Sequence, residues 1–240
     1  MQAPAAIPSL RGIDGAADCP ATRQSLDDGS QYAMVIDIEH AARSISTKNA
    51  GTMSHHHHHP HTHDPIDPDT IRIGTRMIPD DGRFPGNPDL PLVIYKNALA
   101  STSTADFEDL FRNNGWSGTW RNGIFPYHHY HSTAHEVLGM AKGHARVQFG
   151  GRNGVEILIE TGDAVVIPAG VAHKNLEHSE DYLVIGAYPS GEIWDIHTGI
   201  EGERPRSDEN IAQVVLPGSD PIFGERGPLH ELWRLSGNAS

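Results

Sequence analysis

Four histidines and one glutamate lie within nine residues of this 240-residue chain, from His128 to Glu136. His129 and His131 are two residues apart, so in an extended segment their side chains share a face, about 6.6 Å apart along the backbone. Two imidazoles at this spacing can bind one metal ion at about 2.1 Å each. Glu136 follows a four-residue turn and opens the next predicted strand, from which its carboxylate can return beside the histidines.

A second segment supplies a candidate fourth ligand. Residues 162–175 read GDAVVIPAGVAHKN, which predicts a strand, a Pro-Ala-Gly turn and an inward-facing histidine, His173. Pro168 ends the strand and Gly170 allows the chain to reverse. The sequence therefore predicts one divalent metal ion held by four side chains: His129, His131, Glu136 and His173.

These two segments resemble the two motifs of the cupin family. The first motif reads Gly, five residues, His-x-His, three or four residues, Glu, six residues, Gly, and residues 123–143 fill it without a gap. The second reads Gly, five residues, Pro-x-Gly, two residues, His, three residues, Asn, and its first four positions match Gly162, Pro168, Gly170 and His173.

The resemblance departs at the last position, where Glu177 replaces the expected Asn and Asn175 lies two residues early. This departure leaves open how the strand after His173 packs. The likeness covers roughly residues 85–189 and is greatest to small bacterial single-cupin proteins. It implies a mainly β fold, a single RmlC-like jelly-roll barrel (a double-stranded β-helix), with one metal ion per chain. Its ligand types suit iron, manganese, nickel or zinc alike.

Other polar residues near the cluster are weaker candidates. Tyr127 and Arg121 are possible catalytic residues, because Tyr127 shares the inward face and Arg121 could bind an anionic substrate. Most such residues pack the barrel or lie on the surface. Because side chains alternate along a strand, His128 faces away from His129. His135 would replace one of the four ligands only if the turn before Glu136 were shifted by one residue.

The remaining aromatic and histidine residues have ordinary explanations. Trp116 and Trp120 are expected in the core or in a lid, and His144, His178, His197 and His230 on the surface. The tract SHHHHHPHTHD, with histidines at 55–59, 61 and 63, has no predicted scaffold. It is either a flexible chelator of nickel or zinc or an added tag, and neither makes it catalytic.

The rest of the chain indicates what positions the cluster. Residues 1–70 have too little apolar surface to fold and are predicted to be a disordered tail. An N-terminal arm follows over 71–115, with a strand at 90–95 and then a helix that Ser103 and Asp106 begin and Gly115 stops. Phe107, Leu110 and Phe111 fall on one face of this helix. The barrel core is expected over 116–190, with a hairpin at Asn153-Gly154, and an irregular C-terminal arm over 191–240.

Composition limits the partners and the compartment. The net charge of −13 without a basic stripe argues against nucleic acid and against anionic membranes. No apolar run is long enough to cross a bilayer, and the N-terminus lacks a signal-peptide pattern. The single cysteine, Cys19, excludes an intramolecular disulfide. A cytoplasmic protein is expected, with a small-molecule ligand and possible homodimerisation through strand edges.

Three functions are consistent with this pattern. The first is a metal-dependent enzyme, with a dioxygenase as the leading example, acting on a small polar molecule. The second is a Lewis-acid isomerase or epimerase of sugar type, which needs a base near the metal. The third is a non-enzymatic, metal-stabilised barrel that binds a small ligand, since fold alone does not fix function.

Overall fold

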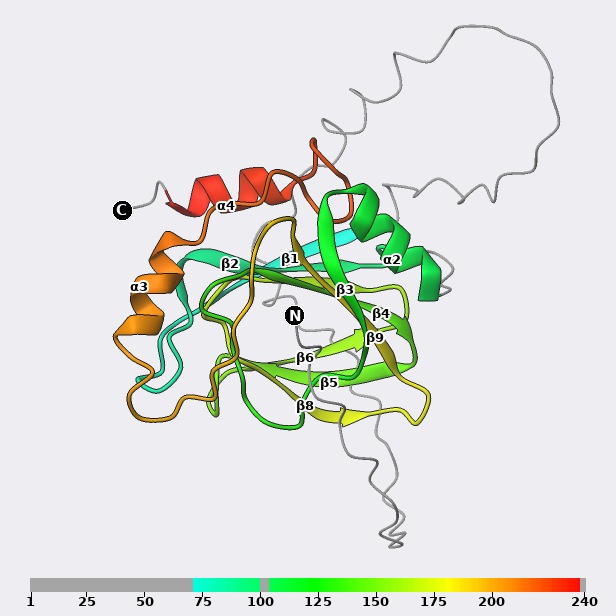
Figure 1. Cartoon of the computed structure of the whole chain (residues 1–240). Coiled ribbons are helices and arrows are strands. Elements are labelled where there is room, and N and C mark those ends of the chain that lie inside the picture. Colours follow the sequence, from blue (N-terminus) through cyan, green and yellow to red (C-terminus); the bar gives the residue numbers. More distant parts are fainter. Residues whose placement is uncertain (1–70, 100–103, 238–240) are drawn as a thin grey trace, which may run out of the picture. The chain divides into compact units, whose positions relative to one another are not determined.

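The structure is a computed structural model that describes residues 71–99 and 104–237 (Figure 1). These residues all belong to one compact unit. The predicted tail, its histidine tract and Ser103 lie outside the described residues. No helix in the described ranges is long and apolar enough to cross a membrane.

Two antiparallel sheets form the body of the fold. The larger sheet has the order β1-β2-β7-β4-β9-β3, and the smaller sheet has the order β6-β5-β8. The sheets face each other across a shared interior, which confirms the predicted jelly-roll barrel (Figure 1). The strands are β1 (Arg72–Ile78), β2 (Asn87–Lys96), β3 (Trp116–Asn122), β4 (Glu136–Lys142), β5 (His144–Phe149), β6 (Val155–Glu160), β7 (Ala164–Ile167), β8 (His173–His178) and β9 (Leu183–Pro189).

The central strands of the larger sheet are buried on both faces. In β4, Leu138 and Met140 point into the barrel, whereas Val137 and Ala141 point to the outer face. Such strands are apolar at nearly every position, which explains the run AVVI in β7. Strand β5 instead alternates buried and exposed side chains, because only one face of the smaller sheet is covered.

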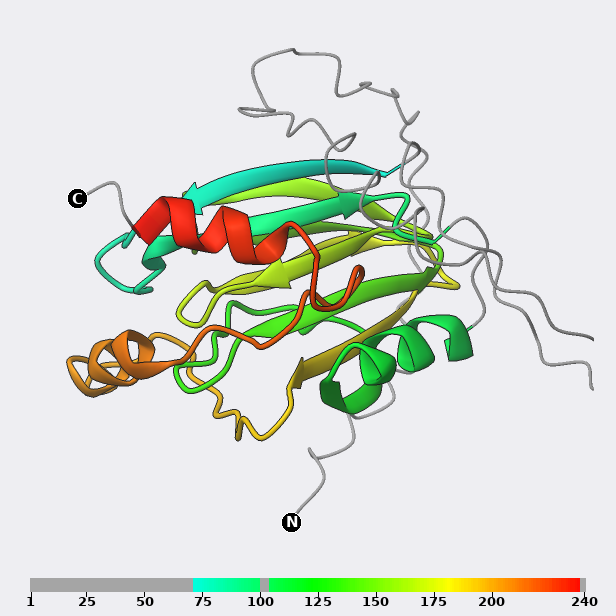
Figure 2. The ribbon, with the colours of Figure 1, turned by 90° about the horizontal axis from the view of Figure 1, so that it is seen from above.

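Helices cover the outer face of the larger sheet (Figures 1 and 2). Helix α2 (Thr104–Asn113) confirms the predicted helix, and its Phe107 and Phe111 are fully buried against the sheet. Gly115 follows with a φ of +78°, a left-handed conformation that ends a helix at little cost for glycine. Helix α4 (Leu229–Gly237) packs on β2, and the Trp233 indole donates a hydrogen bond to the Pro91 carbonyl at 3.0 Å.

The expectation of an irregular C-terminal arm was partly wrong. Two short helices form there, α3 (Arg206–Gln213) and α4. Prolines and glycines crowd the sequence before Leu229 and obscured the pattern. The apolar spacing of Leu229, Leu232 and Trp233 nevertheless follows one helical face, and the sheet stabilises it.

The predicted hairpin at Asn153-Gly154 is confirmed. Strands β5 and β6 pair antiparallel from His144↔Glu160 to Phe149↔Val155, with a five-residue loop between them. Gly150 and Gly151 hold the left-handed positions of this loop. In the larger sheet, β2 pairs with β7 as well as with β1, so the predicted N-terminal arm contributes two strands to the barrel.

The packing of α2 on β4 generates a stability prediction. A Cβ added at Gly139 would collide with the buried ring of Phe107. Gly139→Ala should therefore lower the free energy of unfolding by about 1–3 kcal/mol, measured by urea denaturation. Gly218→Ala is the matched control, because no atom lies within 4 Å of its added Cβ. Equal unfolding midpoints for the two variants would contradict this account of the contact.

Candidate metal centre

Three buried histidines meet at one end of the barrel. His129 and His131 precede β4, and His173 begins β8. The backbones of His129 and His173 exchange hydrogen bonds of 3.2 and 2.9 Å, which fixes the two segments side by side. One ring nitrogen from each of the three lies within 4.8 Å of the others, a spacing that could hold a metal ion.

Glu136 completes the group from the first position of β4. Its Oε2 atom lies 3.2 Å from Nε2 of His131 and 3.3 Å from Nε2 of His173. All four side chains are only 2–4% exposed. The structure thus brings together the four residues that the sequence singled out, although Glu136 and His173, the nearest two from different motifs, are 37 residues apart.

Backbone carbonyls orient all three imidazoles. The Nδ1 atom of His129 lies 3.2 Å from the carbonyl oxygen of Tyr127, and that of His173 lies 3.3 Å from the carbonyl oxygen of Val171. Nδ1 of His131 binds the carbonyl oxygen of Asp195. A carbonyl can only accept, so each Nδ1 carries the proton and each Nε2 offers its lone pair to the centre, the form that binds metals.

The electrostatics of the centre favour a positive charge beside Glu136. Burial, together with the charge that His173 would carry, lowers the pKa of His129 to about 2. Burial alone would lower the pKa of His131, but the negative charge of Glu136 outweighs it and raises that pKa. Burial would likewise raise the pKa of Glu136, yet His131 and His173 lower it well below its usual range.

Two atoms of the centre lack a partner that suits them. Nε2 of His131 and Oε2 of Glu136 are buried without a hydrogen bond. A buried polar atom normally finds a partner, because leaving it unpaired costs about 1–3 kcal/mol. A divalent cation between the inward-facing lone pairs would satisfy both atoms, so the residues present fit a metal ion.

Tyr188 on β9 is a site residue that the sequence analysis missed. Its hydroxyl accepts a hydrogen bond from Nε1 of Trp120 at 3.2 Å and bonds to Glu136. Burial and the charge of Glu136 raise the pKa of Tyr188, so the phenol stays protonated and donates to the carboxylate. Only the alternation of β9, whose inner face includes Val184 and Tyr188, signalled it in the sequence.

The two weak catalytic candidates lie in different places. The ring of Tyr127 is 45% exposed, stacks on Phe125 at 5.0 Å and lies 5.9 Å from the ring of His129. Arg121 pairs with Glu108 of α2, with Nη2 to Oε2 at 2.7 Å, and it is exposed. The structure therefore places Tyr127 beside the histidines and does not bring Arg121 to them.

The neighbouring histidines serve packing. His135 is buried, with Nδ1 accepting from the backbone N–H of Ala169 at 3.0 Å and Nε2 donating to the carbonyl of Val215 at 3.2 Å. Both ring nitrogens are used, so His135 does not replace a ligand. His128 lies against Phe84, with ring centroids 5.3 Å apart.

The expectation for the surface histidines was partly wrong. His144 and His178 are exposed, but His197 and His230 are half-buried. His197 stacks on Tyr130 with ring centroids 5.1 Å apart. Nε2 of His230 lies 2.9 Å from the Pro217 carbonyl oxygen. Both residues belong to the C-terminal arm, whose long-range contacts leave no local pattern in the sequence.

A β-bulge accounts for the departure from the second motif. In the pairing of β5 with β8, Val147 lies opposite Asn175 and Arg146 lies opposite Glu177, so Leu176 is the extra residue. Asn175 consequently stays buried. Glu177 turns outward, where it accepts a hydrogen bond from Arg146 at 2.8 Å.

Hydrogen bonds to other segments also fix the turn before His173. Gly170 donates a hydrogen bond to the His131 carbonyl at 2.8 Å, and its φ of +91° and the nearby Gly86 carbonyl admit only glycine. The Asn87 amide donates to the Ala169 carbonyl at 3.0 Å.

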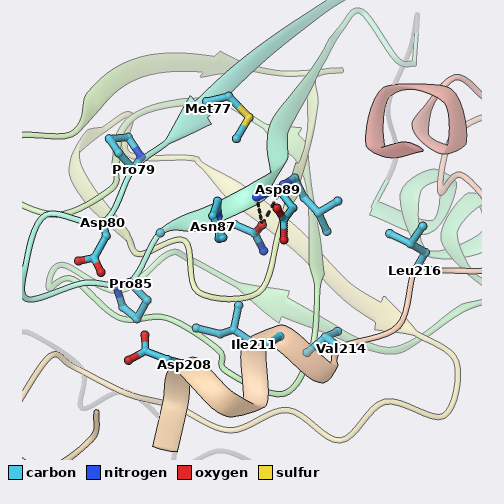
Figure 3. A pocket seen from close by; sticks show the side chains of 14 residues that line it. Met77, Pro79, Asp80, Pro85, Asn87, Asp89, Asp208, Ile211, Val214 and Leu216 are labelled. Atoms are coloured by element: carbon cyan, nitrogen blue, oxygen red, sulfur yellow. Dashed lines mark hydrogen bonds between the residues drawn. The ribbon is translucent and has the colours of Figure 1, made fainter. Parts of the chain in front are cut away.

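A cavity of about 570 Å³ lies next to Asn87, between β2 and α3, and none of the four candidate ligands lines it (Figure 3).

A half-buried carboxyl supports the backbone beside the cluster and predicts a pH dependence. Glu192 accepts the backbone N–H of His135 at 3.0 Å, and burial raises its pKa from 4.5 to about 7. The folded state therefore holds this proton more tightly than the unfolded state. The contribution of the protonated Glu192 to the free energy of unfolding is therefore complete below pH 4.5 and is lost as the pH rises through 7.

Glu192→Gln, which does not titrate, should match the wild type at pH 5 and exceed it at pH 8. Solvent screening of this partly exposed group limits the difference to about 1 kcal/mol, or about 2–4 °C in the melting temperature. Calorimetry at both pH values measures it, with the exposed Glu180→Gln as control. A constant difference between Glu192→Gln and the wild type at the two pH values would refute the assignment.

Comparison with known proteins identifies one clear relative. No protein-family model matches the chain. Similar solved structures include acireductone dioxygenase from Bacillus anthracis with a cadmium ion in its active centre, at 18% identity and a TM-score of 0.29, with 38% of this chain and 63% of that one covered. RmlC from Streptococcus suis in complex with dTDP-D-xylose is 12% identical over 48% of this chain and 68% of that one, with a TM-score of 0.28.

TM-scores this low do not support an assignment of the fold. The fold is therefore assigned from the strand order and from the positions of the two motifs. The uncharacterized protein YjlB of Bacillus subtilis is 51% identical over 159 residues, which cover 66% of this chain and 95% of YjlB. At that identity, over almost the whole relative, the chain belongs to the YjlB family.

Proposed function

We propose that the chain binds one divalent transition-metal ion through His129, His131, Glu136 and His173 and uses it as the centre of an enzyme. The observation that carries the proposal is the convergence of three Nε2 lone pairs and one carboxylate at a buried point, with two of these atoms unpartnered. Mixed nitrogen and oxygen ligands suit iron, manganese, nickel or zinc.

The leading reaction class is metal-dependent oxygenation of a small polar molecule. The bound ion would supply Lewis acidity and, if it is iron, the capacity to activate O₂. The chain's own residues would hold the carboxylate and limit access by water. Tyr188 fixes Glu136 through a hydrogen bond, and Trp194 stacks on Tyr188 at 5.6 Å beside the ring of His131. Tyr127, exposed beside His129, is placed to touch a substrate that enters there.

A second candidate is a non-enzymatic barrel that the metal stabilises. The low exposure of all four donors favours it, because a structural metal site is typically closed to solvent. A Lewis-acid isomerase has less support, since His135, one of its few candidate bases, uses both ring nitrogens in hydrogen bonds away from the four donors.

Metal content tests the site directly. The full-length chain with the seven tract histidines at 55–59, 61 and 63 replaced by serine should retain about one metal ion per chain. The same chain with His131→Ala and Glu136→Gln should retain none, because an imidazole and the only carboxylate are removed. Mass spectrometry of purified protein measures both. Equal metal content in the two proteins would overturn the site.

Access to the metal separates the enzyme from the structural barrel. Nitric oxide added to the Fe²⁺-loaded protein binds only where a coordination position is open, and electron paramagnetic resonance detects it. A signal from nearly all the iron is expected for the oxygenase. Its absence, together with a melting temperature that metal raises strongly, would favour the non-enzymatic barrel.

A further inference from the structure

We infer that residues 192–197, called the strap here, are a positioning element for His131, and that Asp195 is the residue through which the strap acts. This inference rests on the proposed metal site and adds a residue to it. The strap follows β9 and runs beside the segment 130–135, which carries His131. Nothing in the two cupin motifs includes it.

The first argument is an asymmetry among the three histidines. His129 and His173 each bind the carbonyl two residues before them in the chain, at Tyr127 and Val171. Those acceptors are fixed by the same local backbone that fixes the histidine. His131 instead depends on the carbonyl of Asp195, 64 residues away in sequence. The orientation and the tautomer of His131 therefore require the strap to be in place.

The second argument is how the Asp195 carboxylate fastens the strap. One carboxylate oxygen accepts the backbone N–H of Ser132 at 2.6 Å, and the other accepts the Ser132 hydroxyl. Nε2 of His197 lies 2.8 Å from that second oxygen. Asp195 thus holds the residue directly after His131 with its side chain while it holds the His131 ring with its main chain.

Further contacts secure the strap at both ends. Tyr130 and His197 exchange two backbone hydrogen bonds of 2.9 Å. The Thr133 hydroxyl donates to the Ile193 carbonyl at 2.7 Å. Asn210 of α3 donates to the Ser132 hydroxyl at 3.0 Å, which connects the same network to the C-terminal arm. Between these anchors, the Asp195 carboxylate holds Ser132, the residue next to His131.

Loss of that carboxylate should loosen one ligand and leave the other two. Without it the Asp195 carbonyl can move, and His131 can then rotate or carry its proton on Nε2, where the proton blocks metal binding. Removing an outer partner of a metal-binding histidine typically lowers metal affinity 10–100-fold. His129 and His173 retain their local acceptors, so binding is weakened rather than abolished.

The test compares variants of the full-length chain with the tract histidines replaced by serine. Zn²⁺ affinity is measured by competition with a chelator, and the tautomer of His131 by ¹⁵N NMR of the metal-free protein. Asp195→Ala should weaken Zn²⁺ binding 10–100-fold and shift His131 away from the Nδ1–H form. Asp195→Asn, which keeps an oxygen to accept the Ser132 N–H, should recover part of the affinity.

Asp163→Ala is the matched control. Asp163 is also a buried carboxylate, and it accepts the backbone N–H groups of Asn97 at 3.0 Å and Glu160 at 2.8 Å. It precedes β7 at the end away from Ile167, the residue paired with Glu136. Its loss should lower the melting temperature without changing the Zn²⁺ affinity or the tautomer of His131.

The outcomes separate this inference from the proposed function. If the parent protein binds no Zn²⁺ in its barrel, the metal site itself fails. If the parent binds one ion and His131→Ala abolishes binding, but Asp195→Ala binds as tightly as the parent with an unchanged tautomer, only the positioning role fails. A loss of affinity in Asp163→Ala equal to that in Asp195→Ala would also refute it, because general destabilisation would then explain both.

Discussion

The barrel is organised around four electron-pair donors whose side chains are only 2–4% exposed. A buried carboxylate costs several kcal/mol unless a positive charge or hydrogen bonds compensate it. Glu136 faces the imidazoles of His131 and His173, whose Nδ1 protons point away from it toward carbonyl oxygens, so these two Nε2 atoms offer it lone pairs rather than protons. One cation at this point would resolve the conflict for all four groups. Without it, a proton on His131 is the closest substitute, which is why the pKa values of His131 and Glu136 move in opposite directions.

The carboxylate of Glu136 and the histidine lone pairs stay close together only if the surrounding backbone is too rigid to let them move apart. Glu136 begins a strand that lies between β7 and β9 and is packed on both faces, inside by the barrel core and outside by α2. His173 follows a turn held by Gly170 and Asn87, and its backbone is paired with that of His129. These restraints act on the backbone, so the side chains have little freedom to turn away from one another. Helices far from the centre therefore contribute to it through the stiffness of the sheet.

The predictable parts of the fold and the site were those encoded locally. The four donors lie in two short motifs whose spacing alone places them on one face, and α2 and the β5–β6 hairpin follow from apolar periodicity and turn residues. Tyr188 and Asp195 were missed because each reaches the centre only through the tertiary fold, from β9 and from the strap. The inward Asn175 and outward Glu177 depended on a bulge at Leu176, which shifts the pairing by one residue without a sequence signature. Helix α4 needed the sheet beneath it to stabilise a segment crowded by proline and glycine.

The three histidines differ in where the carbonyl that accepts their Nδ1 proton lies in the chain, and this difference decides how easily each imidazole can move. His129 and His173 are tied to each other by backbone hydrogen bonds and to carbonyls two residues before them, so their positions belong to the barrel core. His131 is tied to a segment outside the barrel strands, connected through Ser132 to Asn210 of α3. A change in the C-terminal arm can therefore reach one ligand without disturbing the other two. In a jelly roll whose other two candidate ligands are set by backbone pairing, sequence changes in the arm would tune the affinity of the proposed metal site while the barrel itself stays the same.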